Sequence, residues 1–143
     1  MQLSQVVRTW RIFGIANMVT EFFGGVWSGA NFVTQRLVIP YTAAPVPNAA
    51  LANNFTLTIT DGNAVVFGAP LNPPPAANYA QTISLRIINA SGGAHGAITF
   101  NAIYKTTAAP FPATATGFNR AIDFVWNGTN WVQNFISAAD IPN

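Results

Sequence analysis

The chain has 143 residues, a length that fits one domain and that can bury a sizeable core without covalent cross-links. Only 7% of the residues are charged, against about a quarter in a typical globular domain, and the net charge is +2. The absence of cysteine excludes disulfides, thiolate metal ligands and cysteine nucleophiles, and the scattered cationic residues argue against a nucleic-acid partner. A monomer so poor in charge is weakly solvated, so the composition predicts a surface partly covered by other protein.

The first 35 residues combine apolar and aromatic side chains without a clear period. Residues 3–13 fit helical spacing loosely, and residues 9–12 also fit the alternation of an extended strand. The most apolar stretch, residues 12–19, is far shorter than the ~20 residues that a membrane span requires. We therefore expect neither a membrane span nor a secretory leader in this segment.

Residues 22–32, FFGGVWSGANF, place glycines among bulky aromatic side chains that need a surface to pack on. Two interpretations stay open: an N-terminal arm, residues 1–40, that docks at a subunit interface, or edge strands of the same core. In the first case the subunit-interface residues are Trp10, Phe13, Phe22, Phe23 and Trp27.

The next segment, residues 34–51, contains three prolines. Proline lacks the donor that a sheet requires, so this segment is predicted to cross the surface between strands or sheets. It could equally act as a hinge between the arm and a main domain, residues 41–143.

Residues 54–60, NFTLTIT, alternate strictly between apolar and threonine positions, which predicts a half-buried strand with Phe55, Leu57 and Ile59 facing inward. The turn-forming sequence Asp61-Gly62-Asn63 follows. Residues 64–69 are expected to return as the hairpin partner of this strand. A proline-rich loop then covers residues 70–80.

Residues 81–89, QTISLRIIN, repeat the alternation, with Ile83, Leu85 and Ile87 inward. A glycine-rich turn leads to another strand over 97–105, and a second proline- and threonine-rich loop follows. No helix is expected after residue 40. Short strands separated by Gly/Pro turns predict an all-β fold, an antiparallel β-sandwich with a jelly-roll-like arrangement.

Residues 116–135 predict the final hairpin, with a tight turn at Asn127-Gly128. A two-residue loop would set Trp131 opposite Phe124, whereas a four-residue loop would set Trp131 opposite Trp126. Either register pairs two aromatic side chains across the strands. We therefore interpret both tryptophans as core or cross-strand packing rather than as a platform for a sugar ring.

The sequence offers little catalytic chemistry. It contains four carboxylates and one histidine. Asp61 fits a turn, and Asp123 fits a strand position that faces solvent or pairs with Arg120, so no carboxylate pair of the glycosidase type is expected. His95 lies in a glycine-rich turn and is interpreted as a loop residue, although copies of it could converge on a symmetry axis and bind an ion. We predict no catalytic, cofactor-binding or metal-binding residue.

Two motifs carry a resemblance to a known family. They are T-G-x-N-R-x-I-x-F-x-W-x-G-T-x-W at residues 116–131 and A-D-I-P-N at residues 139–143. With the strands that precede them, they make residues 50–143 resemble the small β-domain proteins of tailed bacteriophage virions. The resemblance does not extend to residues 1–40.

The resemblance implies a β-sandwich, often trimeric, used in capsid decoration, head fibres or tail fibres, and it implies no catalytic residues. We therefore expect a non-enzymatic virion structural protein, a capsid decoration or head-fibre subunit that binds itself as a homotrimer and also binds capsid proteins. No cofactor, nucleic acid or membrane is expected. The alternative is a tail-fibre module that recognises host glycans through loop aromatics, namely Tyr79, Phe111 and Phe118, with Trp126 or Trp131 as further candidates.

Overall fold

The computed structural model describes residues 25–28, 31–75 and 80–143, with side chains from residue 35 onward. The chain divides into two compact units, residues 1–35 and 36–143, each considered by itself. In the smaller unit, β1 (Gly25–Ser28) pairs antiparallel with β2 (Asn31–Thr34). The larger unit begins at Arg36 rather than at residue 41, because residues 36–38 belong to its main sheet.

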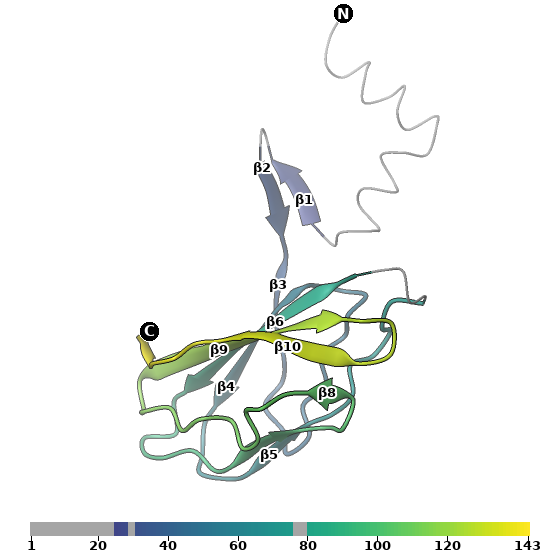
Figure 1. The fold of residues 1–143 in the computed structure, drawn as a ribbon. Helices are drawn as coiled ribbons and strands as arrows, with labels where there is room; N and C mark the ends of the chain where they lie inside the picture. The colour runs from purple at the N-terminus through teal and green to yellow at the C-terminus, as the bar shows by residue number, and fades with distance from the viewer. Residues whose placement is uncertain (1–24, 29–30, 76–79) are drawn as a thin grey trace, which may run out of the picture. The chain divides into compact units, whose positions relative to one another are not determined.

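The larger unit contains a seven-stranded sheet and a separate pair of strands (Figure 1). The sheet has the order β3-β4-β6-β9-β10-β8, and β11 pairs with β9. Its strands are β3 (Arg36–Val38), β4 (Asn54–Ile59), β6 (Thr82–Asn89), β8 (Tyr104–Lys105), β9 (Phe118–Trp126), β10 (Trp131–Ile136) and β11 (Ile141–Pro142). The separate pair is β5 (Val65–Phe67) and β7 (Ile98–Phe100). All elements described are strands, so the all-β prediction is confirmed for this part of the chain.

The sheets are mixed, so the expected antiparallel arrangement is wrong. β4 runs parallel to both of its neighbours, β3 and β6, and β8 runs parallel to β10. The β5–β7 pair is also parallel, whereas β9 is antiparallel to β6, β10 and β11. A parallel pair needs a crossover connection. Between β4 and β6 the crossover is the segment that contains β5.

The expected hairpin between residues 54–60 and 64–69 is therefore absent. Both edges of β4 are already occupied, by β3 and by β6, so β5 has no free edge to join. The chain leaves β4 at Asp61, whose Oδ1 accepts hydrogen bonds from the Asn63 backbone N–H at 2.8 Å and from the Tyr41 hydroxyl. The backbone N–H of Val65 then donates to the Ala97 carbonyl at 2.9 Å, which places β5 beside β7.

Gly96 marks the close approach of these two segments, and it supplies a test of the crossover. A Cβ at Gly96 would lie against the Asn63 carbonyl group and 2.6 Å from the Ala64 nitrogen, atoms of the backbone that cannot swing away. We expect Gly96→Ala to lower the free energy of unfolding by about 1–3 kcal/mol, measured by urea denaturation. Gly93→Ala, where a Cβ meets nothing within 4 Å, is the matched control. Equal stabilities of the two variants would contradict the crossover.

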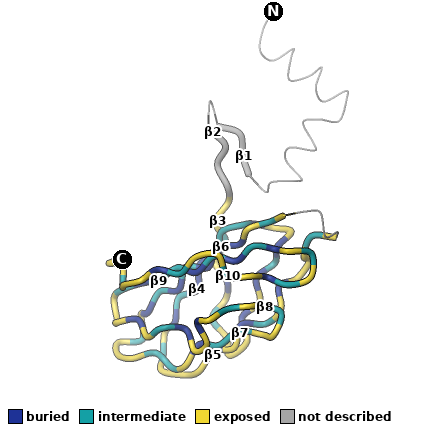
Figure 2. Tube along the Cα trace, viewed as in Figure 1, coloured by how far each residue is buried: buried dark blue, intermediate teal, exposed yellow. Residues whose placement is uncertain are grey.

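The core lies between the seven-stranded sheet and the β5–β7 pair (Figure 2). The predicted inward positions are confirmed, because each of these side chains is at most 2% exposed: Phe55, Leu57, Ile59, Ile83, Leu85 and Ile87. The ring of Phe100 joins the two layers. Its centroid lies 5.3 Å from that of Phe67 on β5 and 5.4 Å from that of Phe124 on β9.

Two segments, residues 97–105 and residues 34–51, differ in their strands from the sequence prediction. The single strand expected over residues 97–105 is split into β7 and β8, because Asn101 turns the chain from one sheet to the other. Its side chain accepts from the Ile103 N–H at 3.1 Å, and its carbonyl accepts from the Tyr104 N–H at 2.9 Å. The segment 34–51 begins with β3 before it becomes the predicted irregular crossing.

The final hairpin is confirmed, in its four-residue form. β9 and β10 pair antiparallel with Trp131 opposite Trp126. The two ring centroids are 5.3 Å apart, and the rings are tilted by 52°. Asn127 closes the loop through its side-chain Oδ1, which accepts from the N–H groups of Thr129 and Asn130 at 3.0 and 2.8 Å, and Gly128 takes a φ of 97°. Asn127 thus supplies the side-chain acceptor that closes the turn, and Gly128 takes the positive φ that the turn requires.

Candidate functional site

The aromatic residues proposed as glycan contacts are mostly buried. Phe111 is 3% exposed because its N–H donates to the Ile98 carbonyl at 2.7 Å and its ring packs edge-on against Phe100. Trp126 and Trp131 are 7% and 0% exposed, as the packing interpretation predicted. The expectation that Phe111 is an exposed loop contact is therefore wrong.

Of the other residues proposed from the sequence as contacts, the structure describes the side chain of Phe118 alone. Phe118 is half-buried at the start of β9, opposite Pro142, so it belongs to a strand rather than to a loop. Tyr79 lies outside the described residues. The proposed subunit-interface residues also lie outside them: Trp10, Phe13, Phe22 and Phe23 entirely, and Trp27 for its side chain, although its backbone is part of β1.

His95 braces two loop segments. Its Nδ1 is 2.7 Å from the Gly96 carbonyl, to which it can donate, and its Nε2 accepts from the Thr114 backbone N–H at 2.9 Å. This arrangement assigns the hydrogen to Nδ1 of a neutral ring. Both ring nitrogens are thus used within the fold, which agrees with the interpretation of His95 as a loop residue.

Arg120 pairs with Asp140 rather than with Asp123. Its Nε lies 2.6 Å from Asp140 Oδ1, and Asp140 Oδ2 accepts from the Ala115 N–H at 2.8 Å. These two interactions, the backbone hydrogen bond first, hold the pKa of Asp140 below its ordinary value. Residues three apart on a strand point to opposite faces, so Arg120 and Asp123 on β9 cannot face each other.

The carboxylates of Asp61 and Asp123 are far apart. Asp123 is in register with Ser84 and, through it, with Asn54 at the start of β4, whereas Asp61 follows the end of β4. The five residue steps along that strand span about 17 Å. Asp61 instead binds Tyr41, and this hydrogen bond, with burial and the Asp61 charge, raises the pKa of Tyr41 to about 12. The same hydrogen bond, with that from the Asn63 N–H, lowers the pKa of Asp61.

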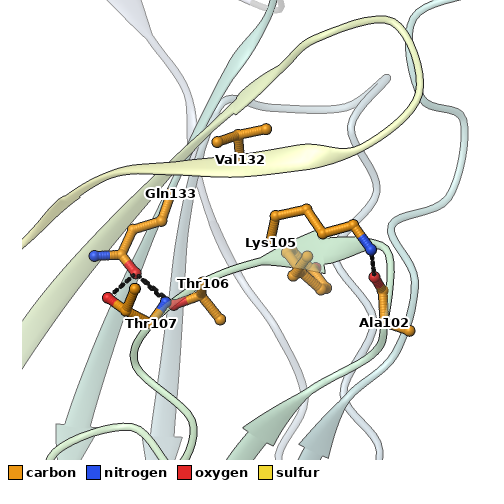
Figure 3. A pocket seen from close by; sticks show the side chains of 7 residues that line it. Ala102, Lys105, Thr106, Thr107, Val132 and Gln133 are labelled. Carbon is orange, nitrogen blue, oxygen red and sulfur yellow. Dashed lines mark hydrogen bonds between the residues drawn. The ribbon is translucent and has the colours of Figure 1, made fainter.

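A hollow of about 660 Å³ lies beside β8 and β10 (Figure 3). Its polar groups largely bind one another: Lys105 Nζ donates to the Ala102 carbonyl at 2.8 Å, and Gln133 Oε1 accepts from the Thr106 hydroxyl and from the Thr107 N–H. The residues that line this hollow include no carboxylate, imidazole or thiol. It can offer hydrogen bonds to a polar ligand but has no nucleophile with an adjacent base.

The outer face of the seven-stranded sheet, opposite the core, carries a different set of side chains. Strand registers place one row across it, from β3 to β10: Arg36, Asn54, Ser84, Asp123 and Phe135. The next row contains Val38, Thr56, Arg86 and Ala121. Val38 and Phe135 are 74% and 49% exposed, and a hollow of about 300 Å³ is lined by Arg36, Arg86, Asn119 and Ile141 among others.

We take this outer face as the candidate functional site. Within the described ranges no group of three His, Cys, Asp or Glu side chains could hold a metal ion, and no helix is long and apolar enough to cross a membrane. No family model, curated protein or solved structure matches the chain. The outer face combines exposed apolar side chains, a hollow and charged groups.

Proposed function

We propose that the chain is a non-enzymatic structural protein of a bacteriophage virion, a capsid decoration or head-fibre subunit. In this proposal it assembles as a homotrimer, contacts capsid or other virion proteins and resides in the particle. The observation that carries the proposal is the exposure of large apolar side chains on a chain with only 7% charged residues. The sequence motifs at residues 116–131 and 139–143 supply the virion context.

The exposed apolar side chains support assembly because they are not all isolated. Among residues 35–75 and 80–143, eight large apolar side chains are at least 36% exposed, and four of them lie on the outer face of the main sheet: Val38, Val132, Phe135 and Ile141. Single exposed apolar residues are common on monomers, whereas a shared face that also contains a hollow is typical of an interface.

The energetics of such an assembly are sufficient for a particle component. Burial of about 1,000 Å² of apolar surface contributes about 25 kcal/mol before the entropy of association and the ordering of side chains are subtracted. The mechanism is therefore burial of apolar area between subunits. It requires no bound cofactor and no chemical step.

The proposed fold within this role is a β-sandwich. The packing of the β5–β7 pair against the main sheet supports two layers around one core. A jelly roll consists of antiparallel Greek keys, and the four parallel pairings in the described residues argue against that finer class. The glycan-binding alternative loses its support from Phe111, Trp126 and Trp131, which are buried.

Immuno-electron microscopy of purified virions tests the proposed function. An antibody raised against the full chain is expected to label the heads of virions from the phage that encodes it, or fibres attached to the heads. Label confined to the tail tip would favour the receptor-binding alternative. Intact particles that carry no label, with the protein present only in the particle-free fraction of infected cells, would contradict the proposal.

A further inference from the structure

We propose that the outer face of the main sheet is a self-complementary contact between copies of this chain. Phe135 and Asp123 of one copy dock onto the hollow that Arg36 and Arg86 line on a neighbouring copy. This inference rests on the proposed function only in assuming that the chain associates with itself. It adds which face does so and which side chains meet.

Among the described residues of the larger unit, the charged side chains that have no partner within the fold all lie on the outer face. Lys105, Arg120, Asp61 and Asp140 each bind a partner within the fold. In residues 36–75 and 80–143, the charged side chains without a hydrogen bond or ion pair are Arg36, Arg86 and Asp123. All three lie on the outer face, as the strand registers show.

The cationic half of the face lies over β3 and β6. Arg36 is exposed and Arg86 is half-buried, and both line the hollow of about 300 Å³ together with the exposed Ile141 of β11. A hollow with guanidinium groups and an aliphatic wall fits an aromatic ring, which an arginine can stack upon, with a carboxylate beside it.

The aromatic and acidic side chains of the proposed contact, Phe135 and Asp123, lie on β10 and β9. A register shift between Gln133 and Phe135 places Phe135 opposite Asp123, while the following residue, Ile136, still packs against the core. Without this bulge, strict alternation would exchange the faces of Phe135 and Ile136. The bulge therefore presents a 49% exposed aromatic ring next to an unpartnered carboxylate.

A second copy is the occupant that this pattern fits best. One face holds both a cationic hollow and an aromatic-acidic projection, so each copy can place its projection in the hollow of its neighbour. Nucleic acid would favour a face of one sign, which the presence of Asp123 opposes. A head-to-tail repeat of the contact forms a ring such as a trimer when its rotation closes, whereas a face-to-face two-fold contact gives a dimer.

Charge reversal tests the contact by sedimentation velocity of the full chain. We expect Arg86→Glu and Asp123→Arg, each alone, to weaken self-association on the order of 10- to 100-fold, since each sets like charges against each other. The double variant R86E/D123R restores opposite charges between positions 86 and 123, although Arg36 then faces an arginine, and it is expected to regain part of the association. Val66→Glu, which adds a carboxylate at a 50% exposed position of β5 in the other layer, is the control and should associate as the wild type does. Far-UV circular dichroism checks that every variant is folded.

The outcomes separate this inference from the proposed function. If the wild type is oligomeric and both single reversals leave its mass unchanged, the outer face is not the contact, whereas the structural role is unaffected. If the double variant stays dissociated, the pairing of Asp123 with the arginines is wrong. Labelled virions combined with a wild-type protein that never self-associates would overturn this inference and the proposed homotrimer, and would leave only the location in the virion standing.

Discussion

Trp131→Ala is expected to lower the free energy of unfolding by about 3–5 kcal/mol, the range for removing a large aromatic side chain from a core. Trp131 is 0% exposed and contacts Trp126 across the hairpin with ring centroids 5.3 Å apart. It is also in register with Tyr104 of β8, so one side chain links three strands at this end of the sheet. Its removal leaves a cavity that the paired strands cannot easily close.

Guanidinium denaturation at one fixed protein concentration measures this loss. Val66→Ala on β5 is the control, because Val66 is 50% exposed, its removal creates no cavity and it lies outside the outer face. We expect this control to change the stability of the folded subunit by less than about 1 kcal/mol. If Trp131→Ala were no more destabilising than Val66→Ala, the interpretation of the tryptophan pair as core packing would be wrong.

Asn89→Ala is expected to cost about 3 kcal/mol, because a buried hydrogen-bonding hub would lose its partners. The Asn89 side chain is 0% exposed. Its Nδ2 donates to the carbonyls of Gly93 and Thr114 at 2.9 and 2.7 Å, and its Oδ1 accepts from the backbone N–H and hydroxyl of Ser91 at 3.0 and 2.7 Å. Alanine would leave several of these groups without a partner inside the fold.

Ser91→Ala is the graded comparison for this prediction, since it removes one hydroxyl and leaves the other contacts of Asn89 in place. It should cost on the order of 1 kcal/mol when both variants are unfolded in urea. Amide hydrogen exchange adds a local readout, and we expect faster exchange at Gly117, whose N–H donates to the Asn89 carbonyl at 2.8 Å. Unchanged stability in Asn89→Ala would show that this network contributes nothing.

The strands predicted correctly are those in which one face is buried and the other is not. Residues 54–59 and 82–89 alternate because Leu57, Leu85 and their neighbours face one core. The final hairpin was also predictable, since Asn127-Gly128 fixes a local turn and the turn fixes the register. Local chemistry is sufficient for such features.

The features that sequence reasoning missed depend on distant parts of the chain. Nothing near Asp61 reveals that β3 and β6 occupy both edges of β4, and that occupancy is what sends β5 to the second layer. Phe111 lies in a proline-rich loop typical of an exposed segment, yet a long-range hydrogen bond to Ile98 holds it in the core. The wrong partner of Arg120 could have been avoided from the sequence. Side chains alternate between the two faces of a strand, so Arg120 and Asp123, three residues apart, point to opposite faces.

The candidate site was partly accessible from sequence. The shortage of charge pointed to covered surface, but composition cannot say which surface. The outer face emerges only when registers bring Arg36, Arg86 and Asp123 together from three separate strands. The bulge that presents Phe135 on this face also depends on pairing and has no signature in the sequence of β10.

Sedimentation equilibrium of the wild-type full chain over a wide dilution series tests the central claim most directly. The claim is that the chain has few ionised groups because neighbouring copies and virion proteins cover part of its surface. It predicts an oligomer, three chains in the proposed assembly, that persists from about 100 µM down to about 1 µM. A single 15.2 kDa species that remains freely soluble at every concentration would contradict it.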